Sequence, residues 1–152
     1  MTDHLQLIQV KLEHLTRMRE YLAYSLSQVE NVMPLNNWAA LGPEHHESMA
    51  AFRVRFSEFQ EHLGKTMRAV AIEEEQDVER FGAVLAFMER LRVLDSTDHW
   101  KVMRELRNAV NHHYEDDTER LAQFFAQLAK ETPVLFEYFR LLQLHCFNAY
   151  GI

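Results

Sequence analysis

The chain has 152 residues, of which 47% are hydrophobic and 26% are charged, and these are ordinary values for one folded domain. Its four glycines and three prolines are too few for the many turns of an all-β protein, whereas its abundant Leu, Ala, Glu, Gln, Met and Arg favour helices. The net charge of −7 argues against broad, charge-driven binding to nucleic acid, although it permits a local basic cleft. We therefore predict one all-α domain over 1–152, a bundle of about five to six helices with an up-and-down core.

The first helix is predicted over 3–32, because apolar residues recur there at alternating steps of three and four, as in a seam between packed helices. Arg19 occupies the one seam position that is not apolar, where it either snorkels to solvent or pairs with a carboxylate of a neighbouring helix. The segment 33–43 holds two prolines and a glycine and is predicted to be a loop. The apolar seam positions are Leu5, Ile8, Leu12, Leu15, Leu22, Leu26 and Val29.

A second long helix is predicted over 44–71 and a third over 76–93. The second carries an aromatic stripe that falls on its only apolar face, so we interpret the stripe as bundle core rather than as a platform for stacking bases. The third would turn Phe81, Leu85, Met88 and Leu91 inward. The stripe of the second helix consists of Met49, Phe52, Phe56, Phe59, Leu63, Met67 and Val70.

The remaining helices are predicted from their capping residues. The sequence Asp-Ser-Thr-Asp at 95–98 offers an N-cap for a fourth helix over 97–114. Asp116, three residues before Glu119, resembles a capping box and predicts the start of a fifth helix. Thr132 followed by Pro133 predicts the start of a last helix that runs to about Cys146, with Thr as the N-cap and Pro at the first helical position.

One short segment carries the residues of most chemical interest: Arg107-Asn108-Ala109-Val110-Asn111-His112-His113-Tyr114. It combines a permanent cation, a titratable imidazole and a phenol within about two helical turns. Phosphate chemistry without a metal needs such a set, because a guanidinium holds anionic oxygens and an imidazole moves a proton. Arg107 and His112 are therefore the candidate catalytic residues.

The helical geometry of this segment has two consequences. A stripe of Val102, Met103, Leu106, Ala109 and Val110 is expected to be buried, with Arg107, Asn111 and Tyr114 on a polar stripe and Asn108 one turn before His112. Arg107 and His112 would point about 140° apart on a regular helix. A joint site therefore needs either a distorted helix near His112 or a second chain across a two-fold axis.

The order and spacing of Arg107, Asn108, His112 and Tyr114 resemble the signature of the HEPN superfamily, and the Tyr two residues after the His is similar to its HepT-like toxin branch. The resemblance is specific over 104–114 and implies a HEPN-like helical fold and a homodimer that joins the motifs of two subunits in one cleft. It further implies a metal-independent endoribonuclease toxin with an RNA substrate and no cofactor. Asn108 would support the pair, and Asn111 and Arg104 would help to position the RNA backbone.

The resemblance also implies a role for Tyr114. In the HepT-like branch this Tyr accepts AMP from a partner minimal nucleotidyltransferase, which acts as the antitoxin and silences the toxin. Anionic adenylates beside Arg107 would neutralise its charge and block the cleft. An alternative is a non-catalytic partner or substrate-binding subunit of a nucleotidyltransferase, which the acidic net charge suits better. A dimeric helical scaffold with a chance motif is a third reading.

Other chemistries lack their residue patterns. The paired Glu-x-x-His motifs of di-iron bundles, His-Glu-x-x-His, Cys-pair zinc sites and phosphate-binding loops are all absent from the sequence, so no metal is predicted. The single cysteine, Cys146, lies among apolar residues and is expected to be a buried small hydrophobe. We found no signal-peptide pattern or apolar stretch of membrane-spanning length, so we expect a cytoplasmic protein that binds neither membrane nor DNA.

Overall fold

The computed structural model describes residues 1–109 and 117–152, and within these ranges it contains five α-helices, a short 3-10 turn and no strand. The helices are α1 (Asp3–Val32), α2 (Pro43–Glu73), α3 (Phe81–Arg90), α4 (Thr97–Asn108) and α5 (Thr118–Tyr150), and the 3-10 turn η1 is Trp38–Ala40. The prediction of an all-α bundle is confirmed. The loop predicted over 33–43 is confirmed over 33–42, with η1 inside it, and Pro43 is the first residue of α2.

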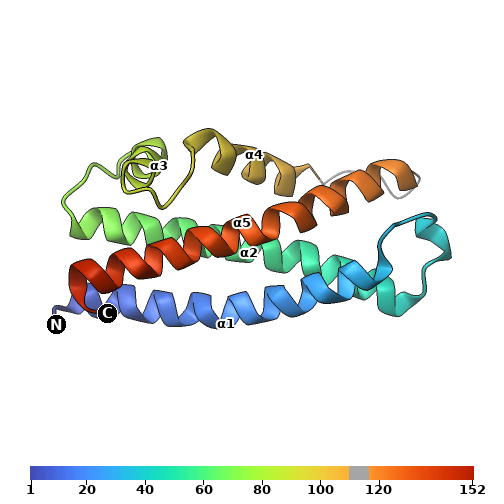
Figure 1. Ribbon diagram of the computed structural model, residues 1–152, viewed down its shortest axis with the longest axis horizontal. Coiled ribbons are helices and arrows are strands. Elements are labelled where there is room, and N and C mark those ends of the chain that lie inside the picture. Colours follow the sequence, from blue (N-terminus) through green and yellow to red (C-terminus); the bar gives the residue numbers. More distant parts are fainter. Residues whose placement is uncertain (110–116) are drawn as a thin grey trace.

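Three long helices form the body of the bundle (Figure 1). α1 runs against α2 and α5, and the two chain termini lie at the same end. The short helices α3 and α4 pack on the other side of α2 and α5 from α1. Among the described helices none is long and apolar enough to cross a membrane.

The predicted seams form the core. All seven residues of the aromatic stripe on α2 are completely buried, so their interpretation as bundle core is confirmed. On α1 five of the seven seam residues are buried, and Leu5 and Leu26 are partly buried. The guanidinium of Arg19 lies 4.6 Å from the centre of the Phe136 ring, and the side chain is exposed. Arg19 forms no ion pair within the described ranges, which agrees with the first of its two readings.

The third helix is shorter than the predicted range 76–93, because a residue with a left-handed backbone conformation lies before it and another lies after it. Glu75 has φ 57° and ends α2, and the Gln76 N–H donates to the Ala71 carbonyl. Arg92 has φ 61°, and the Val93 N–H donates to the Met88 carbonyl at 2.9 Å. Both turns satisfy backbone groups that a longer helix would otherwise use.

The predicted helix start at Thr132-Pro133 is wrong, since α5 continues through both residues. Thr132 is completely buried, and its hydroxyl donates to the Leu128 carbonyl at 2.8 Å instead of capping a new helix. Pro133 has no N–H to donate to the Ala129 carbonyl, yet the apolar face of α5 stays in register with the core on both sides. Tertiary packing therefore outweighs the local preference of proline for a helix start.

Candidate functional site

The fourth helix begins where its capping residue predicts. The Ser96 hydroxyl accepts a hydrogen bond from the His99 N–H at 3.0 Å, which fixes the first turn of α4. The described part of this helix ends at Asn108, and Ala109 forms a turn. The predicted continuation to 114 falls in 110–116, which lies outside the described residues.

The buried side of α4 differs from the predicted stripe. Val102 is 51% exposed and Ala109 is exposed, whereas Trp100 is only 2% exposed and Met103 is completely buried. Trp100 lies two turns before Arg107, about 20° away around the helix axis. Arg107 therefore lies beside the face that docks on α2 rather than on an opposite polar face.

This docking places Arg107 in contact with α2. Its Nη1 donates to the backbone carbonyl of Ser57 at 3.2 Å, and the side chain is partly buried. Arg104, one turn earlier, is also partly buried. Both arginines line one pocket of about 210 Å³ together with Gln60, Glu61, Gly64, Lys65, Arg68, Phe81 and Trp100.

The pocket is basic although the chain is acidic. Four cationic side chains line it, Lys65 and Arg68 from α2 and Arg104 and Arg107 from α4, against the single carboxylate of Glu61. Glu61 lies 3.4 Å from the Lys65 Nζ. Within 1–109 and 117–152 the three arginines have no carboxylate partner. Such a site attracts an anion more strongly than the net charge of the whole chain indicates.

The predicted site residues therefore divide into two groups. The structure brings Arg104 and Arg107 together on the basic pocket and places Asn108, which is exposed, at the end of α4. Asn111, His112 and Tyr114 belong to 110–116 and lie outside the described residues.

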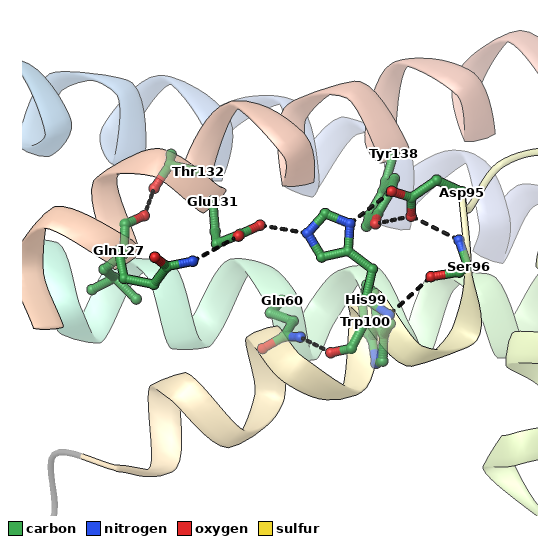
Figure 2. Close-up of polar contacts among 10 residues, drawn as sticks. Gln60, Asp95, Ser96, His99, Trp100, Gln127, Glu131, Thr132 and Tyr138 are labelled. Carbon is green, nitrogen blue, oxygen red and sulfur yellow. Dashed lines mark hydrogen bonds and ion pairs between the residues drawn. The ribbon is translucent and has the colours of Figure 1, made fainter.

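A second polar cluster was not predicted from the sequence. His99 lies between two carboxylates, with its Nδ1 2.6 Å from Asp95 and its Nε2 2.7 Å from Glu131 (Figure 2). The Tyr138 hydroxyl donates to the second oxygen of Asp95, and the Gln127 amide donates to Glu131 at 3.0 Å. The cluster ties the start of α4 to the middle of α5. It thereby helps to hold the helix that carries Arg104 and Arg107.

The surroundings of His99 favour its charged form. Partial burial lowers the pKa of His99, but hydrogen bonds to Asp95 and Glu131 and the two negative charges outweigh this effect and raise the pKa overall. Partial burial raises the pKa of Asp95, but hydrogen bonds from Tyr138 and His99 lower it by more, so the net shift is downward. Burial and the neighbouring Asp95 raise the pKa of Tyr138. A charged His99 donates to both carboxylates at once.

We expect His99 to make stability depend on pH. A raised pKa in the folded state gives stability that is complete below the ordinary value of 6.5 and is lost as pH rises through the folded pKa. The wild type should therefore melt at a higher temperature than His99→Gln. The difference between the two melting temperatures should be largest near pH 6 and should shrink towards pH 9. Thermal melts of both proteins across this range give the measurement. A difference that stays constant with pH would show that His99 is neutral in the cluster.

The Cys146 thiol has surroundings that make it unreactive. Burial, reinforced by Glu74, raises the pKa of the Cys146 thiol to about 12, and the side chain is fully buried, as expected for a small hydrophobe. No group of three or more His, Cys, Asp and Glu residues in the described part of the chain could hold a metal ion.

The chain was compared with models of known protein families, with curated proteins and with solved structures. No family model, no curated protein and no solved structure matches it.

Proposed function

We propose that the protein is a metal-independent endoribonuclease that acts as the toxin of a toxin–antitoxin pair. The observation that supports this proposal best is the position of Arg107. It belongs to the HEPN-like motif and lines a basic pocket with Arg104, Lys65 and Arg68 on an otherwise acidic chain. The position agrees with a guanidinium that binds the phosphate backbone of RNA.

The proposed reaction uses the RNA's own 2′-hydroxyl as the nucleophile. Its oxygen forms a bond to the adjacent phosphorus, the bond from phosphorus to the 5′-oxygen breaks, and the products carry a 2′,3′-cyclic phosphate and a 5′-hydroxyl. His112 takes the proton from the 2′-hydroxyl or orients it. Arg107 stabilises the charge that develops on the phosphoryl oxygens. Asn108 supports this pair, and Arg104 and Asn111 position the RNA backbone.

A homodimer completes the proposed site. The HEPN-like motif implies a site built from two subunits, so a second copy of the motif across a two-fold axis would bring a second Arg107 and His112 to the cleft. α4 would then lie near that axis. Sedimentation at micromolar concentration that finds only an 18.1 kDa monomer would contradict this arrangement.

The cleavage proposal is tested with Arg107→Lys. The variant should cleave RNA about 100-fold more slowly than the wild type, because an ammonium group cannot replace the planar fork of a guanidinium at a phosphate. Arg17→Lys is a matched control, since Arg17 is exposed on α1. Cleavage is followed on gels with and without EDTA. Equal rates for Arg107→Lys and the wild type would contradict the role of the fork, and inhibition by EDTA would indicate a metal-dependent nuclease.

We propose that a minimal nucleotidyltransferase silences the protein by AMPylation of Tyr114. Tyr114→Phe should remain toxic, since a phenol with an ordinary pKa near 10 is a poor general base at neutral pH. After co-expression with a nucleotidyltransferase encoded beside this chain, intact-mass analysis should show steps of one AMP on the wild type only. Adducts on Tyr114→Phe, or loss of cleavage in that variant, would contradict this role.

The alternative proposal is a non-catalytic partner or substrate-binding subunit of a nucleotidyltransferase. The net charge of −7 favours it over RNA cleavage. One experiment distinguishes the two proposals. A purified protein that forms a stable complex with the nucleotidyltransferase but leaves RNA intact supports the binding subunit.

A further inference from the structure

The basic pocket extends well beyond the motif. One wall of the pocket is formed by α2, which contributes Glu61, Gly64, Lys65 and Arg68 at helical spacing. The opposite wall is formed by α4, which contributes Arg104 and Arg107. Arg107 is thus shared between the motif and the pocket. A strand whose reacting phosphate lies at Arg107 would bring a neighbouring phosphate to Lys65 and Arg68.

The size of the pocket limits its occupant. Its volume of about 210 Å³ lies below the range of about 300–1,000 Å³ that is usual for drug-sized ligands. The floor is close-packed, since a Cβ on Gly64 would lie 3.1 Å from the Phe81 Cζ and 3.4 Å from the Trp100 Cζ2. The space suits a phosphate with part of its sugar better than a complete nucleotide cofactor.

Two polar groups of the pocket residues lack partners. Gln60 is 1% exposed, and its amide donates to the Trp100 carbonyl at 3.3 Å, but its Oε1 accepts no hydrogen bond from any described residue. The Arg68 Nη2 donates to the Val78 carbonyl at 2.8 Å, while its buried Nε has no partner within the same ranges. Buried polar groups normally find partners. Because both atoms are buried, a phosphate in the pocket would be held by the positive charges of Lys65 and Arg68 and not by these two atoms.

We propose that this pocket binds the phosphodiester next to the cleaved one in single-stranded RNA, with Lys65 and Arg68 as positioning residues. The proposal rests on the proposed RNA cleavage and deepens it. A dinucleoside monophosphate should then be a poor substrate, because it lacks the flanking phosphate that contributes binding free energy in the pocket. Longer single strands are the preferred substrate class.

The first test measures binding without cleavage. A fluorescein-labelled 2′-O-methyl RNA ten-mer has no 2′-hydroxyl nucleophile, so anisotropy reports its Kd alone. Lys65→Gln and Arg68→Gln should each raise the Kd at least about fivefold and reduce the salt slope by about one. Arg17→Gln is the control and should bind as the wild type does, because Arg17 is exposed on α1, a helix that lies on the other side of α2 from α4. Lys65 is largely exposed, so its substitution leaves the fold intact even if Arg68→Gln lowers the melting temperature.

The second test measures the contribution of the flanking phosphate. The wild type should cleave a trinucleotide with one extra phosphodiester, on the 5′ or the 3′ side, at about tenfold higher kcat/KM than a dinucleoside monophosphate, mainly through KM. Lys65→Gln should lose most of this preference. The ratio of two substrates on the same protein cancels any general loss of active enzyme.

The outcomes separate the two proposals. Weaker binding by the pocket variants together with no cleavage by the wild type supports the phosphate site and removes the ribonuclease. Cleavage by the wild type, with unchanged Kd and unchanged substrate preference in Lys65→Gln and Arg68→Gln, overturns the phosphate site alone. Displacement of the labelled RNA by micromolar inorganic phosphate would also overturn it, because the pocket would then serve a free anion.

Discussion

His112→Ala is expected to abolish detectable RNA cleavage and to relieve growth arrest when the protein is expressed. A positioned general base contributes about 10²- to 10⁴-fold to a rate, and alanine can neither accept the 2′-hydroxyl proton nor orient the hydroxyl. Arg107 would remain in place on its pocket, since its guanidinium is held by the Ser57 carbonyl on α2. The variant should therefore still bind uncleavable RNA with a Kd close to that of the wild type.

His113→Ala is the matched control for this experiment. It removes an imidazole from the adjacent position, which is not part of the Arg-x4-His-x-Tyr motif, so cleavage should persist. Circular-dichroism melts of both variants distinguish a catalytic loss from a structural one. Unfolding of His112→Ala at a clearly lower temperature than the wild type would make His112 a core residue and remove the catalytic assignment.

The long helices could be predicted from the sequence because their apolar patterns are long. The seam of α1 extends from Leu5 to Val29, and the predicted bounds 3–32 agree with the observed Asp3–Val32. α2 was predicted over 44–71 and extends over Pro43–Glu73. In both helices each apolar seam residue independently indicates that the same face is buried, so a single exception such as Arg19 does not alter the prediction of a helix.

The errors occurred where one or two residues decide the structure. Glu75 and Arg92 adopt left-handed backbone conformations without being glycine, and no pattern in the sequence marks them. Thr132 and Pro133 match the signature of a helix start, but buried residues on both sides, among them Leu128 and Leu135, hold α5 straight through them. A local capping pattern does not determine the helix boundary where the packing of many residues favours a continuous helix.

The candidate site was predictable in its chemistry and not in its geometry. The motif identified Arg107 and Arg104, but the pocket depends on Lys65 and Arg68, which are about forty residues away and become neighbours only when α4 docks on α2. The predicted buried stripe of α4 does not include Trp100, and the burial of Trp100 turns the helix so that Arg107 contacts α2. The cluster around His99 needs Glu131 from α5, and an acidic residue between apolar neighbours is a weak signal until its partner is known.

The largest effect on stability is expected from Phe59→Ala. Phe59 is completely buried, and its ring meets those of Phe136 and Phe139 edge to face, with centres 5.6 Å and 5.8 Å apart. The substitution removes the transfer free energy of the ring and leaves a cavity between α2 and α5, at a cost of about 3–5 kcal/mol. Urea denaturation should show this as a lower midpoint with an unchanged slope.

Val54→Ala is the control, because Val54 lies on the same helix with 48% of its side chain exposed and should cost less than about 0.5 kcal/mol. The consequence for function follows from the position of Phe59. α2 supplies Lys65, Arg68 and the carbonyl that holds Arg107, so its packing on α5 keeps both walls of the basic pocket in place. Phe59→Ala should therefore lose RNA binding at the temperature at which it unfolds and not before. Loss of binding while the variant is still fully folded would mean that Phe59 acts on the pocket directly and not through the free energy of unfolding.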